Sequence, residues 1–332
     1  MILGLIMRVI AGIALMLLIT VFAVLFEGVD RKLHAVMQRR IGPPLLQPVY
    51  DILKLLGKEN IVPRWATPVF FHGGPWVAMI ASMMVFMYIP MGSLPPVLNG
   101  SGDLILILYL LSLSGVAVAV GGFASGSPIA NVGAQREMIL MMSYEVPLAI
   151  VVSTLAWFAY KLGMPGHPFS LETYVATSVW SVVGKAGFLG LICLFVAILT
   201  VIPGETGKGL MDIPEAKTEI LEGVTVEYSG VNLALLHIGF NLRGAAISAL
   251  VVSLFFPFSL GKAIGLSGVP MAIIDFPWFW VKVFLVEVFG VTFLRTAFGR
   301  LKIWQASHFY WAQVGALSLA GMILISVDVL LH

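Results

Sequence analysis

Eight apolar runs, each about as long as a bilayer is thick, constrain this chain more than any other feature of its sequence. A transmembrane helix needs about 20 predominantly apolar residues to cross the hydrocarbon layer. The composition agrees, because 59% of the 332 residues are hydrophobic and 11% are charged, whereas soluble domains carry about 25% charged residues. The predicted fold class is therefore an all-α integral membrane protein with about eight transmembrane helices. The predicted spans are roughly 5–26, 68–90, 103–122, 138–160, 184–203, 231–257, 273–296 and 311–331.

The distribution of lysine and arginine predicts the orientation of these spans. Basic residues concentrate in the connections that follow the odd-numbered spans, and the positive-inside rule assigns such connections to the cytoplasm. We expect a single polytopic domain over residues 1–332 in the cell (plasma) membrane, with both termini outside. The expected cytoplasmic loops are about 27–67, 123–137, 204–230 and 297–310.

The first of these loops contains a second kind of helical signal. Residues 45–57 place apolar side chains such as Leu46, Ile52 and Leu53 at helical spacing, with Asp51 and Lys54 between them. This pattern is typical of an amphipathic helix that lies on a membrane surface. We therefore predict a surface helix on the cytoplasmic side; that it only seals the rim of the protein is an equally good interpretation.

Negative charge gathers in the segment "MDIPEAKTEILEGVTVEYSG" at residues 211–230. Pro214 suits the first turn of a helix, with Asp212 as its N-cap. The acids at 215, 219 and 222 would then share one helix face, where like charges repel unless bases neutralise them or protons are shared. The segment is either a solvated acidic loop or, as we favour, a carboxylate cluster on a proton or cation path. Its acids are Asp212, Glu215, Glu219, Glu222 and Glu227.

Further ionisable residues fall within or beside the predicted spans. Such residues are costly in lipid, so they normally face the protein interior and mark ion paths or structural pairs. Glu137 and Glu145 extend the candidate path, and Lys282 with Glu287 is a candidate buried pair. Arg243 with Glu145 is a second candidate structural pair. His237 alone is expected to be an interhelical hydrogen-bonding residue. The set is Glu137, Glu145, His237, Arg243, Lys282 and Glu287.

No motif indicates catalysis by this chain alone. Its single cysteine, Cys193, lies in an apolar run, so it can form neither an intrachain disulfide nor a cluster-binding motif. The sequence contains no phosphate-binding loop, nucleophile triad or zinc motif in a convincing context, and no basic run that suggests nucleic acid. We expect no metal and no cofactor in this chain, so any redox centre must belong to another subunit.

Four motifs together carry a resemblance to a known family. They are "DRKLHAVMQRRIGPPLLQPVYDILKLLGKE", "GAQREMILMMSYEVP", "DIPEAKTEILEGVTVEYSG" and "RTAFGRLKIWQ". In this order, from Glu27 to about Trp311, the chain resembles the eight-span proximal membrane subunit of complex I and of energy-converting membrane-bound hydrogenases. The resemblance implies that the segment 211–230 and Glu145 of "SYEVP" form the path of carboxylates called the E-channel. It also implies that a peripheral redox arm docks on the cytoplasmic loops, for which the candidates are Arg31, Lys32, Arg39, Arg40, Arg295 and Arg300.

Departures from complex I favour the hydrogenase branch, including its relatives that reduce sulfur compounds. The turn "RIGPPLLQP" is shorter than the complex I turn that lines the quinone path, and Lys217 and Trp304 replace acids. This branch implies ferredoxin as electron donor, hydrogenase-like large and small subunits, an iron–sulfur protein and antiporter-like membrane subunits. Iron–sulfur clusters, and in a hydrogenase a nickel–iron centre, would then lie in those partners.

The resulting prediction is a membrane-anchor and coupling subunit of a ferredoxin-dependent, ion-pumping respiratory complex, without catalysis of its own. A subunit of a quinone-reducing complex I, a stand-alone ion transporter and a purely structural anchor stay open, although a transporter would show inverted repeats. The terminal acceptor (protons, a sulfur compound or quinone) and the pumped ion (proton or sodium) are likewise open.

Overall fold

The computed structural model describes residues 2–98, 100 and 102–331, with side chains described from Gly12 onward. Eight helices are long and apolar enough to cross a membrane, and within the described residues the only β-type pairing is an isolated bridge between Met91 and Leu94. The prediction of an all-α membrane protein with about eight spans is therefore confirmed. The long helices are α1 (Ile2–Met37), α3 (Pro68–Tyr88), α4 (Asp103–Ala124), α5 (Pro128–Lys161), α8 (Lys185–Thr206), α10 (Gly230–Phe255), α12 (Val269–Glu287) and α15 (Gly315–Leu331).

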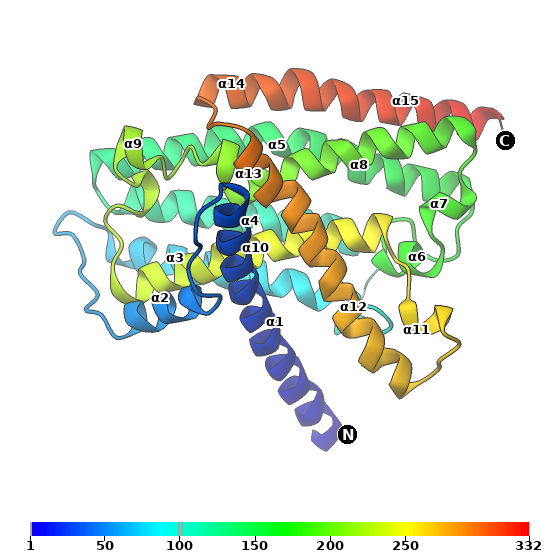
Figure 1. The fold of residues 1–332 in the computed structure, drawn as a ribbon, viewed down its shortest axis with the longest axis horizontal. Coiled ribbons are helices and arrows are strands. Elements are labelled where there is room, and N and C mark those ends of the chain that lie inside the picture. The colour runs from blue at the N-terminus through cyan, green and yellow to red at the C-terminus, as the bar shows by residue number, and fades with distance from the viewer. Residues whose placement is uncertain (1, 99, 101, 332) are drawn as a thin grey trace.

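Short elements gather at the two ends of this bundle (Figure 1). One end, which we call the α2 end, carries α2 (Gln47–Leu56), α9 (Lys217–Ile220), α13 (Leu294–Ala297) and α14 (Ile303–His308), together with the 3₁₀ turns Gly209–Met211 and Gly223–Thr225. The opposite end carries α6 (Leu171–Ala176), α7 (Val179–Val182) and α11 (Leu260–Ala263). Two π-helical turns, Val288–Phe293 and Phe309–Val314, make α12 continuous with α13 and α14 continuous with α15.

Helix α10 lies at the centre of the bundle, and α1 and α12 cross its side at a steep angle (Figure 1). In α10, 72% of the membrane-length window is buried, against 28% in the spans that begin with α1 and α12. Small residues bring the other helices close, as lipid-embedded interfaces require. A Cβ atom added to Gly74 of α3 would lie 2.8 Å from the carbonyl oxygen of Ala117 in α4. The polar residues of α10 are therefore enclosed by protein.

Two helices extend past the ends that hydropathy predicts. Helix α1 continues to Met37 and α5 begins at Pro128, so the predicted loops 27–67 and 123–137 are partly helical. Hydropathy detects only the lipid-facing length, whereas these extensions carry polar residues that face a cavity described below. The helix predicted over 45–57 is present as α2, and its Leu46, Leu53 and Leu56 are exposed.

The helix predicted through the acidic segment is wrong. Only Lys217–Ile220 form a helical turn, after which Leu221 and Glu222 adopt left-handed φ values of 49° and 74°. The chain folds back so that the amide of Val224 donates to the carbonyl of Pro214 at 3.3 Å. A segment this short has too few hydrogen bonds to maintain a helix alone, and closure onto Pro214 replaces it. The acids at 215, 219 and 222 consequently point in different directions.

Candidate functional site

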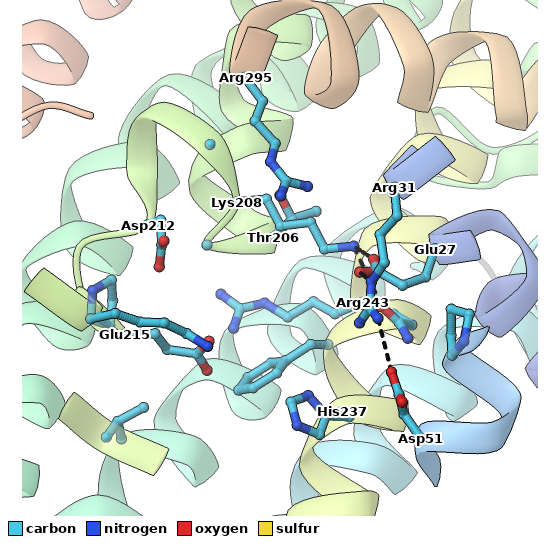
Figure 2. A pocket seen from close by; sticks show the side chains of 18 of the residues that line it. Glu27, Arg31, Asp51, Thr206, Lys208, Asp212, Glu215, His237, Arg243 and Arg295 are labelled. Carbon is cyan, nitrogen blue, oxygen red and sulfur yellow. Dashed lines mark hydrogen bonds and ion pairs between the residues drawn. The ribbon is translucent and has the colours of Figure 1, made fainter. Parts of the chain in front are cut away.

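A polar cavity of about 780 Å³ opens at the α2 end. Five elements distant in sequence line it: α1, α2, α5, α10 and the connection 207–229 between α8 and α10. Figure 2 shows Asp212 and Glu215 on one side, Glu27, Arg31 and Asp51 on the other, and Arg243 between them. Charged side chains of both signs therefore meet in one enclosed space inside a membrane protein, which is the usual mark of a functional site.

The first charged group in this cavity joins α1 to α2 and to the connection 207–229. Glu27 forms ion pairs with Lys208 and, at 2.9 Å, with Arg31, which also contacts Asp51 at 2.9 Å. Burial alone would lower the pKa of Lys208, but the carboxylates of Glu27, Asp30 and Glu287 raise it. Lys208 is thus held as a cation in the wall of the cavity.

The second charged group centres on Arg243 of α10. Its guanidinium contacts Glu205 of α8 at 2.7 Å and Glu137 of α5 at 3.0 Å, and it donates to the hydroxyl of Tyr144. Arg243 is 2% exposed, so these contacts take place away from solvent. Arginine stays charged in proteins and its planar fork suits two carboxylates at once. One fixed cation therefore holds two buried acids from different helices.

Asp212 and Glu215 are the acids of the cavity without a base in direct contact. Burial, the neighbouring Asp212 and the charge of Glu137 raise the pKa of Glu215 from 4.5 to about 8, although Lys217 partly offsets this. Within the described part of the chain, Oε1 of Glu215 is shielded and has no hydrogen-bond partner. Burial also raises the pKa of Asp212, which Arg300 and Arg295 partly offset. Glu215 can therefore gain or release a proton near neutral pH.

The remaining acids of the segment lie outside the cavity. Glu219 is paired with Arg136 at 2.7 Å and with Arg300 at 3.0 Å, and Glu222 with Lys217 at 2.9 Å. Glu227 is half-buried and lines neither this cavity nor the pocket described next. Only the first two acids of the predicted cluster thus face the interior.

Glu145 lies in a second, smaller cavity of about 230 Å³ that we call the lateral pocket. It opens between α4 and α5, where Tyr109 is 70% exposed and Ile105 is 42% exposed. Glu205, which pairs with Arg243, also lines it. Among the described protein groups, Oε1 of Glu145 finds no hydrogen-bond partner although it is shielded. A carboxylate therefore faces an opening on the outer face of two membrane spans.

Neither of the two structural pairs predicted from the sequence is found among the described ion pairs. Lys282 donates to the backbone carbonyls of Phe256 and Phe258 at 2.7 and 2.9 Å, so it closes the far end of α10. Glu287 instead lies on the side of Lys208. Arg243 pairs with Glu137 and Glu205 rather than with Glu145. His237, expected to bond another helix, lines the cavity at the α2 end.

The six docking candidates divide into two groups. Lys32, Arg39 and Arg40 are exposed and form none of the ion pairs found in the described residues. Arg31, Arg295 and Arg300 are engaged within the chain, with Arg295 held by Asp30 at 3.0 Å. The second group therefore shapes the cavity and its rim.

Sequence reasoning missed three charged residues of the site: Glu27, Glu205 and Lys208. Each lies at the end of a predicted span, in "FEGVDRK" or "PGETGKG", where a charge is consistent with ordinary interfacial placement. The useful signal was the helix extension, because a charge beyond the lipid-length run can still be buried when the helix continues. Within residues 2–98, 100 and 102–331, no group of three or more His, Cys, Asp and Glu side chains is placed to hold a metal ion.

Comparison with known proteins places this site in a family. The family described as NADH dehydrogenase matches residues 10–326. Hydrogenase-4 component C of Escherichia coli is 31% identical over 78% of this chain and 79% of that protein. A membrane subunit of the NADH-quinone oxidoreductase of Geobacillus kaustophilus is 30% identical over 95% of this chain and 92% of that protein.

The fold also matches a solved complex closely. A chain of the membrane-bound sulfane sulfur reductase, an archaeal respiratory membrane complex, superposes with a TM-score of 0.81 and 28% identity, covering 97% of this chain and 99% of the other. The family expected from the four sequence motifs is thereby confirmed. This multi-span membrane protein belongs to the NADH dehydrogenase family, and it is similar both to the proximal membrane subunit of complex I and to the hydrogenase and sulfur-reductase counterparts of that subunit.

Proposed function

We propose that this chain is the membrane-anchor and coupling subunit of a ferredoxin-dependent, ion-pumping respiratory complex of the hydrogenase or sulfur-reductase type. Its similarity to hydrogenase-4 component C and to a chain of a sulfane sulfur reductase supports this assignment. Electron transfer takes place on iron–sulfur clusters of partner subunits, with a nickel–iron centre if the complex is a hydrogenase. The chain itself docks those partners and responds to their charge.

The α2 end faces the cytoplasm of a cell whose plasma membrane holds the complex. The exposed cations Lys32, Arg39 and Arg40 lie at this end, as the positive-inside rule requires. They are the part of the chain that a peripheral redox arm of hydrogenase-like large and small subunits and an iron–sulfur protein would contact. Antiporter-like membrane subunits pack on the lipid-facing side, where the lateral pocket opens.

One observation carries the coupling role: buried carboxylates form a series from the cavity to the lateral pocket. Asp212, Glu215 and Glu137 line the cavity, and Glu205 and Glu145 line the pocket. Clustered buried acids can hold and pass protons because each ionised carboxylate makes its neighbours harder to ionise.

The steps follow from this order. A change of charge in the docked redox arm alters the field at the cavity, and Glu215, with a pKa of about 8, gains or loses a proton in response. The altered charge passes through Glu137 and Glu205 to Glu145, which presents it to the neighbouring membrane subunit.

The decisive experiment replaces Glu145 with Gln in the intact complex, reconstituted in proteoliposomes. Electron flux from ferredoxin and the acidification of the lumen are measured together. We expect electron flux to continue while ion transport per electron falls by on the order of tenfold or more. Glu222→Gln is the matched control, because that acid is exposed and paired at the rim. Normal pumping at full electron flux in Glu145→Gln would refute the proposal.

Metal analysis of the same preparation separates the two branches. The complex is purified through a tag on this chain, and its nickel is counted. About one nickel per complex identifies a hydrogenase; iron and acid-labile sulfur without nickel identify a sulfur- or quinone-reducing relative.

A further inference from the structure

The two cavities are separated by a single side chain. Arg243 and Glu137 line the cavity at the α2 end, whereas Glu205 lines the lateral pocket. Because Arg243 contacts Glu137 at 3.0 Å and Glu205 at 2.7 Å, its guanidinium bridges an acid of one cavity to an acid of the other. We call Arg243, Glu137 and Glu205 the neck.

The neck is packed on every side that the structure describes. On one side the hydroxyl of Tyr144 accepts a hydrogen bond from Arg243, and the ring of Tyr144 meets that of Tyr310 edge to face at 6.1 Å. On the other side α4 approaches through Gly115, where an added Cβ would lie 3.3 Å from Nη2 of Arg243 and 3.0 Å from the sulfur of Met141. The guanidinium therefore has little freedom to move aside.

This arrangement treats protons and metal cations differently. A sodium ion that leaves the first cavity must come close to a permanent positive charge, and in a water-poor neck that repulsion is strong. It must also displace the guanidinium from two carboxylates. A proton needs no such space, because it can leave the carboxyl group of Glu137 while Glu205 takes one up. Arginines placed in narrow pores exclude cations by the same charge effect.

We propose that Arg243 acts as a cation filter, which restricts the passage between the cavity and the lateral pocket to protons. This inference rests on the proposed coupling function and adds the identity of the ion to it. Arg243 is a positioning and selectivity residue: it holds the two acids in place and takes up no proton itself.

The test is the passive entry of ²²Na⁺ into proteoliposomes that contain the complete complex, under a potassium diffusion potential and without electron donor. Wild-type complex should admit sodium no faster than lipid vesicles. Arg243→Gln should raise sodium entry by about tenfold or more, since it removes the full charge of the neck. Arg243→Lys, which keeps the charge, should restore exclusion. Arg300→Gln is the matched control, because Arg300 pairs with Glu219 at the exposed rim.

Two further measurements keep the outcome unambiguous. Arg243→Gln leaves buried acids uncompensated, so the double variant Arg243→Gln with Glu205→Gln is made as well, and it should also admit sodium. Entry of radiolabelled choline is measured in parallel, because a merely loosened structure would leak both ions, whereas a lost filter admits the small ion alone.

Sodium exclusion in both assembled variants, or equal leakage of sodium and choline, would overturn the filter. The coupling proposal fails separately, when Glu145→Gln pumps normally. Loss of pumping in Glu145→Gln together with sodium exclusion in both neck variants would therefore refute the filter alone.

Discussion

Replacing Glu215 with Gln should stabilise the α2 end of the molecule at alkaline pH and leave it nearly unchanged in acid. The pKa of Glu215 is raised from 4.5 to about 8 because the carboxyl group is buried beside Asp212 and Glu137. The folded chain consequently keeps a proton that the unfolded chain releases above pH 4.5. Stability falls as the pH rises from 4.5 through about 8 and levels off above it.

The magnitude follows from about 1.4 kcal/mol per unit of pKa. The full rise from 4.5 to about 8 corresponds to at most about 5 kcal/mol. Part of that penalty is already present at pH 6, so the advantage of the Gln variant should grow by roughly 2.7 kcal/mol between pH 6 and pH 9. Partial access of solvent to the cavity reduces the measured value.

Hydrogen exchange of the segment 207–229 in the purified complex measures this local stability, after correction for the intrinsic pH dependence of exchange. Infrared spectroscopy gives the titration directly, as a protonated-carboxyl band that disappears with a midpoint near pH 8 and is missing in Glu215→Gln. Glu222→Gln is the control, because that acid is exposed. A midpoint near the ordinary 4.5, or the same protection at both pH values, would refute the interpretation of Glu215.

Other perturbations test the remaining contacts. Glu27→Gln leaves Lys208 buried without its closest carboxylate and should cost about 3–5 kcal/mol, measured as a lower Tm of the complex, whereas Glu219→Gln breaks only partly exposed pairs and should cost under about 1 kcal/mol; equal losses would contradict the burial of the first pair. Gly223→Ala forces a side chain at φ 50°, with its Cβ 2.0 Å from the carbonyl oxygen of Pro214, so the turn should open by at least about 2 kcal/mol and limited proteolysis should cut within 207–229; unchanged proteolysis would count against the described turn.

The membrane architecture could be read from the sequence because lipid imposes one simple requirement, an apolar run of fixed length. Six of the predicted starts lie within a few residues of the observed ones, as for α3 at Pro68 and α10 at Gly230. The first and fourth spans were too short, since nothing in hydropathy marks a helix that continues inside protein. Family membership was equally readable, because it depends on motifs rather than on geometry.

The site was less predictable, because its cavity depends on tertiary contacts. Glu215 and Glu222 look equivalent in the sequence, yet a left-handed turn at Leu221 and Glu222 sends one inward and the other to the surface. Arg243 was recognised as a buried charge, but its partners came from α5 and α8, far away in sequence. Spacing along one helix cannot reveal contacts among three.

The lateral pocket has a consequence for the cell that makes this protein. Glu145 faces an opening between α4 and α5 on the outer surface of the bundle, so before assembly a carboxyl group meets lipid. An unshielded polar group within the bilayer is costly, and it distinguishes an orphan chain from an assembled one. We expect membrane quality control to remove the unassembled chain, so that its abundance follows that of the neighbouring subunit which covers α4 and α5.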